Sequence, residues 1–521
     1  MSPTRSRRRG RFPRIPLRLL VGVATILLGG AAAAMPGAFD DQPEASPAGG
    51  DRLVNAGARD LTDIRANNSP TLVRNPRDDQ ELAIANRVDS PRFSCALHVS
   101  VDGGTRWRSV PIPSPKGEEP KCFAPDVTYG ADGRLYLSFV TLKGNGNVPN
   151  AVWLSTLRGR SLTRPRKLLG RLSFQVRLVA DPKTPRRLYL TWLKASDVGL
   201  YQFSEAGNPA VFMRSDDGGT TWRRPARISS SARPRVVAPS LAVGPDGALN
   251  ALLLDLGDDR LDYTGAHQGR GGTPYPGPWN LVLSRSEDGG RSWKEAEVAP
   301  DVTPIERIIV FLPAFPSIAA DPRNGRLYAA FHDGGLGDPD VRLWSSSDDG
   351  ASWSEPRRVN DTALRDKRAQ YLPKVDVARN GRVDVLYYDR RRDPRDIRND
   401  VSLQSSFDGG RTFSDHVRLT RRSFDSRIAF GSERGLPDLG SRLGLLSADR
   451  RALAVWTDTR SGTIASRKQD LAARVVTFSR PSGPSDSTED ALRYGGGALI
   501  ALGLGLVAWW LVSSQRTRRG G

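Results

Sequence analysis

Carboxylate and guanidinium groups recur at the ends of short apolar segments, a place where a fold can gather reactive side chains. Four such segments end in an acid: Asp255, Asp333, Asp389 and Asp458. Two of these acids are followed by arginines, in phrases that contain Arg390 and Arg460. Pairs of carboxylates act on glycosidic bonds, and arginine binds anionic groups through paired hydrogen bonds. The alternative is that these groups form turn caps and ion pairs inside a repeat, because the acid recurs by position.

A repeated eight-residue box accounts for the spacing of these segments. Its pattern, Ser-x-Asp-x-Gly-x-Ser/Thr-aromatic, begins at residues 100, 215, 286, 346 and 406, and a degenerate copy begins at residue 155. A repeat of this length is typical of stacked supersecondary units. The Ser and Asp side chains can hold a tight turn, and the aromatic ring can fill the space between sheets. We assign these structural acids to the boxes: Asp102, Asp216, Asp288, Asp348 and Asp408.

Hairpin signals surround each box. Turns rich in Asn-Gly, Asp-Gly and Pro separate two apolar segments before the box, and a further segment follows it. Each unit therefore holds four strands, and radial repetition of such units makes a β-propeller. Seven hairpins predict seven blades, with six as the alternative because only six boxes are found. The seventh unit lacks a fourth strand, which we expect residues 60–65 to supply.

The boxes resemble those of the Asp-box (BNR repeat) superfamily, which includes sialidases, related glycosidases and non-enzymatic relatives. The resemblance spans residues 60–478 and implies an all-β propeller with the boxes on the face opposite to the ligand. It also implies where sialidase residues would lie. By position, the substrate arginines would be Arg74 or Arg87, and a Tyr–Glu pair would use Tyr371 and Glu433. The Phe-Arg-Ile-Pro phrase of sialidases is missing from the repeats, since its nearest match, Phe12 to Pro16, lies in the N-terminal segment.

The longest connection predicted on the ligand face runs from Asp255 to Trp279. It carries Tyr263, His267, Tyr275 and Trp279 among many glycines. Long loops on a rigid scaffold often carry function, and aromatic rings suit stacking on sugars. An ordered loop without a ligand is the alternative.

Two cysteines and four histidines limit the other chemistries. Cys95 and Cys122 fall at strand ends of neighbouring units, so we expect a disulfide in an exported chain. The histidines show no ligand spacing, and the boxes offer few carboxylates each, so we predict no metal site. Nothing in the sequence indicates a cofactor.

The chain ends indicate export and membrane anchoring. Residues 1–34 combine a basic start, an apolar core and small residues, as an export signal does, and residues 35–59 form a leader. Residues 479–493 read as a flexible stalk. Residues 494–513 are apolar enough for a transmembrane helix, and arginines in the tail, residues 514–521, place that tail in the cytoplasm.

Net charge is +20, but much of it lies in the two tails. The charge therefore does not indicate nucleic-acid binding. We predict a single-pass membrane protein whose propeller lies outside the cell membrane and binds glycans or surface proteins, or serves as a scaffold. The alternative is an exo-acting glycoside hydrolase for sialic acid or another acidic sugar.

Overall fold

The computed structural model describes most of the chain between residues 43 and 479. The described residues are 23–25, 43–55, 64–196, 208–259, 275–305, 315–429, 438–479, 498–509 and 511. They divide into two units, of which residues 45–478 form the larger. The prediction of Glu433, Tyr263 and His267 as functional residues falls outside the described part.

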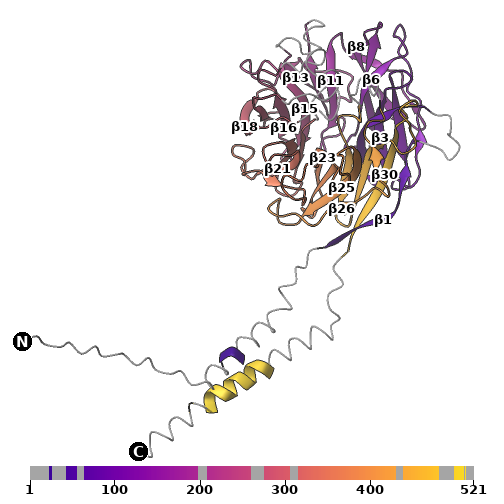
Figure 1. The fold of residues 1–521 in the computed structure, drawn as a ribbon. Helices are drawn as coiled ribbons and strands as arrows, with labels where there is room; N and C mark the ends of the chain where they lie inside the picture. Colours follow the sequence, from indigo (N-terminus) through magenta and orange to yellow (C-terminus); the bar gives the residue numbers. More distant parts are fainter. Residues whose placement is uncertain are drawn as a thin grey trace, which may run out of the picture. The chain divides into compact units, whose positions relative to one another are not determined.

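The larger unit is a β-propeller of seven antiparallel blades (Figure 1). The first blade contains β2 (Asn67–Asn75), β3 (Asp78–Val88), β4 (Ser94–Ser100) and β5 (Arg108–Ser109). The second contains β6 (Cys122–Tyr129), β7 (Leu135–Lys143), β8 (Val148–Arg158) and β10 (Arg166–Leu169), with β9 (Ser161–Leu162) paired to β8. The third contains β11 (Ser173–Ala180), β12 (Leu188–Lys194), β13 (Ala210–Ser215) and β14 (Ala226–Arg227). The fourth contains β15 (Val236–Val243), β16 (Leu249–Asp255), β17 (Trp279–Ser286) and β18 (Lys294–Val302).

The remaining three blades follow the same order. The fifth contains β19 (Ser317–Ala320), β20 (Leu327–Asp333), β21 (Asp340–Ser346) and β22 (Arg357–Arg358). The sixth contains β23 (Gln370–Val377), β24 (Val383–Asp389), β25 (Arg398–Ser406) and β26 (Val417–Arg418), with β27 (Phe424–Asp425) paired to β25. The seventh contains β28 (Gly444–Ala448), β29 (Arg451–Asp458), β30 (Asp470–Ser479) and β1 (Glu44–Leu53). The prediction of seven blades is therefore confirmed.

The ring closes through contacts between the first strands of successive blades. These inner strands are β2, β6, β11, β15, β19, β23 and β28, and each contacts the inner strand of the next blade, the last contacting the first. Because strands within a blade are antiparallel, the box turns and the hairpins between first and second strands share one face, which we call the box face. The other connections share the opposite face, which we call the top face.

The strand that completes the seventh blade differs from the prediction. We expected residues 60–65 to supply it, but β1 from the predicted leader pairs with β30 (Figure 1). Asn55 Nδ2 donates to Asp470 Oδ1 at 2.9 Å, and Val54 N donates to Leu471 O at 2.7 Å. The leader sequence Glu44 to Leu53 is small and polar, so its strand character did not show in the hydrophobic pattern. Consequently the propeller begins near residue 44.

The box turns have the geometry that their sequence predicts. In the third blade Ser215 Oγ donates to Asp217 Oδ1 at 2.8 Å and accepts from Gly219 N at 2.8 Å. Thr221 N and Oγ1 donate to the same carboxylate at 2.9 and 2.7 Å. These bonds lower the pKa of Asp217 to about 2, against the opposing effect of burial. The assignment of Asp216 to this box is wrong.

Asp216 lies beside the box acid but has a different role. Its carboxylate forms ion pairs with Arg187, Arg214 and Arg223 at 2.6 to 2.9 Å. The other four box acids are correctly placed, and each accepts a hydrogen bond from the first serine of its box. The two consecutive acids at 216 and 217 caused the one-residue error.

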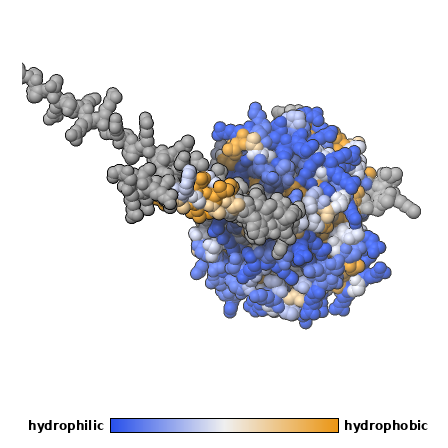
Figure 2. Space-filling model, turned by 90° about the horizontal axis from the view of Figure 1, so that it is seen from below, coloured by the Kyte–Doolittle hydropathy of each residue, from blue (hydrophilic) through white to orange (hydrophobic). Residues whose placement is uncertain are grey.

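The surface of the propeller offers little apolar area. Its exposed large apolar side chains are scattered over separate connections: Leu53, Ile64, Val101, Leu364 and Ile464. The face seen in Figure 2 is mostly hydrophilic. In the other unit, residues 498–509 are helical. Among the residues that the structure describes, no helix has the length and apolar character needed to cross a membrane.

Candidate functional site

The four acids at strand ends on the top face are turn caps. Each accepts a hydrogen bond from the backbone N–H two residues later: Gly257 N to Asp255, Gly335 N to Asp333, Arg391 N to Asp389 and Arg460 N to Asp458, at 2.8 to 3.1 Å. Each also pairs with an arginine of its own blade or of the preceding connection. A carboxylate held in this way stabilises its turn. The contacts of these repeated acids therefore agree with the alternative that they are turn caps and ion-pair partners within the repeat.

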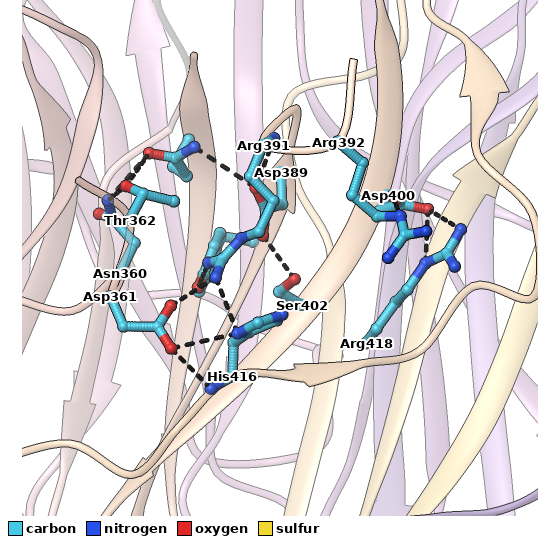
Figure 3. Close-up of polar contacts among 12 residues, drawn as sticks. Asn360, Asp361, Thr362, Asp389, Arg391, Arg392, Asp400, Ser402, His416 and Arg418 are labelled. Atoms are coloured by element: carbon cyan, nitrogen blue, oxygen red, sulfur yellow. Dashed lines mark hydrogen bonds and ion pairs between the residues drawn. The ribbon is translucent and has the colours of Figure 1, made fainter. Parts of the chain in front are cut away.

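Asp389 shows how completely such an acid is engaged (Figure 3). It is buried, and its Oδ2 accepts from Ser402 Oγ at 2.7 Å as well as pairing with Arg391. Arg391 continues to Asp361 and to His416 Nδ1. The network therefore consists of donors and acceptors that satisfy one another, and it ties the fifth blade to the sixth.

Several other predicted residues are also buried in structural contacts. Tyr371 Oη lies between Asn399 and Arg390, and burial raises its pKa. Arg390 itself donates to Asn399, Ser426 and the carbonyl of Asp396. Because Tyr371 is fully buried and has no carboxylate partner among the described residues, it lacks the contacts of an activated nucleophile.

The predicted ligand residues are widely separated. Arg74 lies at the hairpin end of β2, on the box face, and pairs with Asp79, so it does not belong to the top face. Trp279 is buried and donates its Nε1–H to Asp259 Oδ2 at 3.1 Å. Tyr275 is half-buried against the core. Arg460 pairs with Asp458 and with Asp51 of β1, so it links the closing strand β1 to β29 of the seventh blade.

Arg87 is the predicted residue that the structure places in an unusual setting. It is buried and forms ion pairs with Asp89, at 2.7 Å, and with Asp438. Asp89 ends the second strand of its blade like the four capping acids, but residue 91 is proline and offers no N–H for a cap. Asn68 Nδ2 donates to Asp89 instead, at 2.8 Å. Burial and the nearby Asp438 raise the pKa of Asp89 to about 6, against the pull of Arg87.

Beneath Arg87 the inner strands share a distortion that the sequence did not reveal. Five inner strands carry a residue with positive φ followed by a register shift: Ser69, Ala124, Gln175, Ala238 and Leu372. A bulge of this kind re-aims the side chains that follow it. A non-glycine residue with positive φ costs about 1 kcal/mol or more. Because this cost recurs in five inner strands, the packing of the rest of the fold must stabilise the bulged conformation.

Three of the five residues that lie two places after these positive-φ residues are charged. The five are Thr71, Asp126, Arg177, Ser240 and Lys374. Arg442, which precedes β28, reaches the same region and donates to Ser69 O at 3.1 Å and to Pro125 O at 2.6 Å. We call Arg177, Lys374 and Arg442, with Asp126 and Asp376, the inner cluster.

The inner cluster has more donors than acceptors. Asp126 already accepts from Thr71 Oγ1 at 2.7 Å and from Leu178 N at 2.8 Å, and it lies 3.6 Å from Arg177 Nε. Asp376 accepts from Ser447 N at 2.7 Å. Arg177 Nε and Nη1 are buried and make no hydrogen bond within the described part of the chain. Lys374 Nζ likewise has no hydrogen bond or ion pair among those residues.

The cations of the inner cluster lower one another's pKa. Burial and the neighbouring Arg177 lower the pKa of Arg442 to about 9. Burial also lowers the pKa of Lys374, and Arg177 and Arg442 add to that effect. Buried donors are usually paired, so this arrangement favours an anionic group that accepts from Arg177 and Lys374 together.

A sequence signal for the inner cluster exists, but we did not use it. Arg177, Lys374 and Asp126 interrupt otherwise apolar inner strands, as in Gln-Val-Arg-Leu-Val and Pro-Lys-Val-Asp-Val. Charged residues in the middle of an inner strand are unexpected in a structural role. Searching for such interruptions would have found the cluster.

The predicted disulfide between Cys95 and Cys122 is confirmed, with the two Cα atoms 5.5 Å apart. It joins the first blade to the second near Arg87, whose guanidinium lies over the Phe123 ring at 4.8 Å. Within the described residues, no three His, Cys, Asp or Glu side chains are grouped so that they could hold a metal ion.

Seven blades, five of which carry a serine–aspartate box turn, make the architecture recognisable as a β-propeller. No family model matches the sequence. A xyloglucanase of Paenibacillus sp is 26% identical over 206 residues, which are 38% of this chain and 17% of that protein. The match thus covers only a small part of the relative's length.

Solved structures with a similar chain path include two glycan-degrading enzymes. A protein of unknown function from Dyadobacter fermentans is 14% identical, with 84% of this chain and 100% of that chain covered and a TM-score of 0.47. The Hadza microbial sialidase Hz136 is 15% identical, with 78% and 75% covered and a TM-score of 0.43. The Penicillium chrysogenum α-L-arabinanase is 15% identical, with 70% and 95% covered and a TM-score of 0.40.

Proposed function

We propose that this protein is a membrane-anchored, extracytoplasmic glycan-binding propeller whose ligand carries a carboxylate or a similar anionic group. The observation that carries this proposal is the surplus of donors in the inner cluster, above all Nε and Nη1 of Arg177, which are buried and make no hydrogen bond among the described residues. A carboxylate between Arg177 and Lys374 would accept charge-assisted hydrogen bonds, which are stronger than neutral ones. The apolar residues 494–513 are the proposed anchor, and residues 1–34 are the proposed export signal.

The repeated acids support binding rather than catalysis. Asp255, Asp333, Asp389 and Asp458 are committed to their turns. A glycan-binding role needs only oriented donors, and the inner cluster provides them.

An exo-acting glycoside hydrolase for an acidic sugar is the second candidate, and Asp89 favours it. Its pKa of about 6 leaves a protonated carboxyl available in mildly acidic solution, as a general acid requires. Asp438 lies on the other side of the shared Arg87. In this candidate Asp89 would donate its proton to the glycosidic oxygen, and Asp438 would be the second carboxylate. The acid and the second carboxylate would then have the separate roles that glycoside hydrolysis uses.

One experiment tests both candidates. Residues 43–479, which include β1, are purified and screened against acidic and neutral glycans, and in parallel against fluorogenic glycosides. We expect binding restricted to acidic glycans, weakened about tenfold or more by Arg177→Gln. Arg224→Gln, which removes an exposed arginine near the third box, is the matched control.

The possible outcomes separate the candidates. Hydrolysis that is lost in Asp89→Asn would establish the enzyme. Absence of binding to every acidic glycan, or equal binding by the Arg177→Gln variant, would contradict both the site and the function proposed for it.

A further inference from the structure

Three neighbouring connections on the top face carry an unusual number of exposed basic side chains. They are residues 361–369 before β23, residues 390–398 before β25, and residues 421–428 before β28. Eight basic side chains of these connections are exposed, of which Arg421 pairs with Asp51 and Arg427 with Asp425. The other six are Arg365, Lys367, Arg392, Arg395, Arg398 and Arg422. We call these six the basic rim.

The three connections form one continuous surface. Asp396 Oδ1 accepts from Ala369 N at 2.9 Å, which joins the first connection to the second. Ser426 Oγ donates to Ile397 O at 2.6 Å, which joins the second to the third. The first connection also leads directly into β23, which carries Lys374 of the inner cluster.

Two acids beside the rim are buried, whereas its six basic side chains are exposed. Asp393 is buried and accepts from Ile397 N and Arg398 N at 3.0 and 2.6 Å. Asp400 at the base of the rim is also buried; it accepts from Arg418, as Figure 3 shows, and from Thr420 and Ser423. In the basic rim, only Arg392 approaches a carboxylate, with its Nε 4.0 Å from Asp400.

Backbone geometry keeps two rim residues in place. Arg365 and Lys367 both have positive φ, at 57° and 60°. Lys367 N donates to Asp338 Oδ2 at 2.8 Å, which anchors this connection to the fifth blade. The rim therefore presents its cations from a fixed loop, which lowers the ordering cost of binding an anionic partner.

We propose that the basic rim binds an acidic polysaccharide, so that the ligand is a polymer with repeated anionic sugars rather than a single sugar. This inference rests on the proposed glycan-binding function and extends it from one anionic group in the inner cluster to several along the chain. Separated arginines suit a polymer because each can meet a different carboxylate or sulfate group.

Other polyanions fit the surface less well. The only aromatic residue in the three connections is Phe424, which is buried, so no aromatic ring there can stack on nucleic-acid bases. Both ends of the propeller unit lie at the box face, because β30 ends there and β1 begins beside it: Ser46 Oγ is 3.3 Å from Thr477 Oγ1. A segment that continues from either end towards a membrane thus starts on the face opposite to the basic rim.

The test compares a polymer with its own building block. Binding of residues 43–479 to polygalacturonate and to galacturonic acid is measured by calorimetry, with methyl-esterified polygalacturonate as the uncharged polymer. The rim variant is Arg365→Asn, Lys367→Asn, Arg392→Gln and Arg395→Gln, where Asn suits the two positive-φ positions. The control variant removes four exposed arginines of the box face: Arg158, Arg160, Arg224 and Arg411 to Gln.

We expect the polymer to bind more tightly than the monomer, and added salt to weaken its binding strongly. The rim variant should lose about tenfold in polymer affinity and keep its monomer affinity. Equal loss in the rim and control variants, equal affinity for monomer and polymer, or tighter binding to duplex DNA or phosphatidylserine vesicles would overturn this inference. If neither monomer nor polymer binds, the proposed function fails as well.

Discussion

The two faces of the propeller use the same side chains for different purposes. On the box face, Ser and Asp repeat from blade to blade, and their hydrogen bonds close within each turn. On the top face, four repeated acids are likewise closed within their turns, but Asp89 breaks the repeat and is engaged with Arg87 and Asn68 instead. The comparison teaches that a residue explained by the repeat is structural, and that a charged residue departing from it is a better candidate for function.

The closing strand β1 is the exception that sharpens this comparison, because it does not repeat and yet is structural. A fragment that begins at residue 60 lacks β1 and its contacts with β30. We expect this fragment to lose cooperative unfolding and to become sensitive to protease, whereas residues 43–479 stay resistant. Limited proteolysis and thermal unfolding compare the two. Equal resistance would show that β1 is dispensable.

Replacing a repeated acid of the top face should affect folding alone. Asp389→Ala removes a buried carboxylate together with its ion pair to Arg391, which keeps only Asp361, and should lower the free energy of unfolding by about 3 kcal/mol. The affinity of the remaining folded protein for acidic glycans should not change. Urea unfolding and calorimetry measure the two quantities. A change in affinity without a change in stability would place Asp389 in the binding site.

The adjacent acids of the third box offer a matched pair. Asp217→Ala removes four hydrogen bonds that hold the turn and should cost about 1 to 2 kcal/mol. Asp216→Ala removes half-exposed ion pairs and should cost less than about 1 kcal/mol. Thermal unfolding of both variants tests this order, and the reverse order would contradict the assignment of the box acid.

Asp89 should also make the stability of the protein depend on pH. Its pKa of about 6 lies above the usual value of 3.8, so the folded protein binds this proton more tightly than the unfolded chain does. The stabilising contribution is therefore complete below pH 3.8 and is lost as the pH rises through about 6. Urea unfolding between pH 4 and 7 should show this decline in the native protein and a flatter profile in Asp89→Asn. Parallel profiles would mean that Asp89 does not titrate in this range.

The sequence predicted the repeat architecture well, but the inner cluster was not predicted. Box spacing and hairpin turns predicted seven four-stranded blades, because turn chemistry is local and strongly tied to residue type. The strand β1 was missed because Gly, Ala and Ser carry no strand pattern. Arg177 and Lys374 were missed because their convergence depends on backbone bulges, each a single inserted residue that leaves no clear mark in the sequence.

The central claim is that the inner cluster is arranged for an anionic ligand rather than for stability. Lys374→Met tests it most directly, because burial disfavours the charge of the partly exposed Lys374, so its removal should not destabilise the fold while it weakens ligand binding. We predict an unfolding midpoint equal to or above that of the native protein, together with an affinity for acidic glycans lowered about tenfold or more. A lower unfolding midpoint with unchanged affinity would contradict the account.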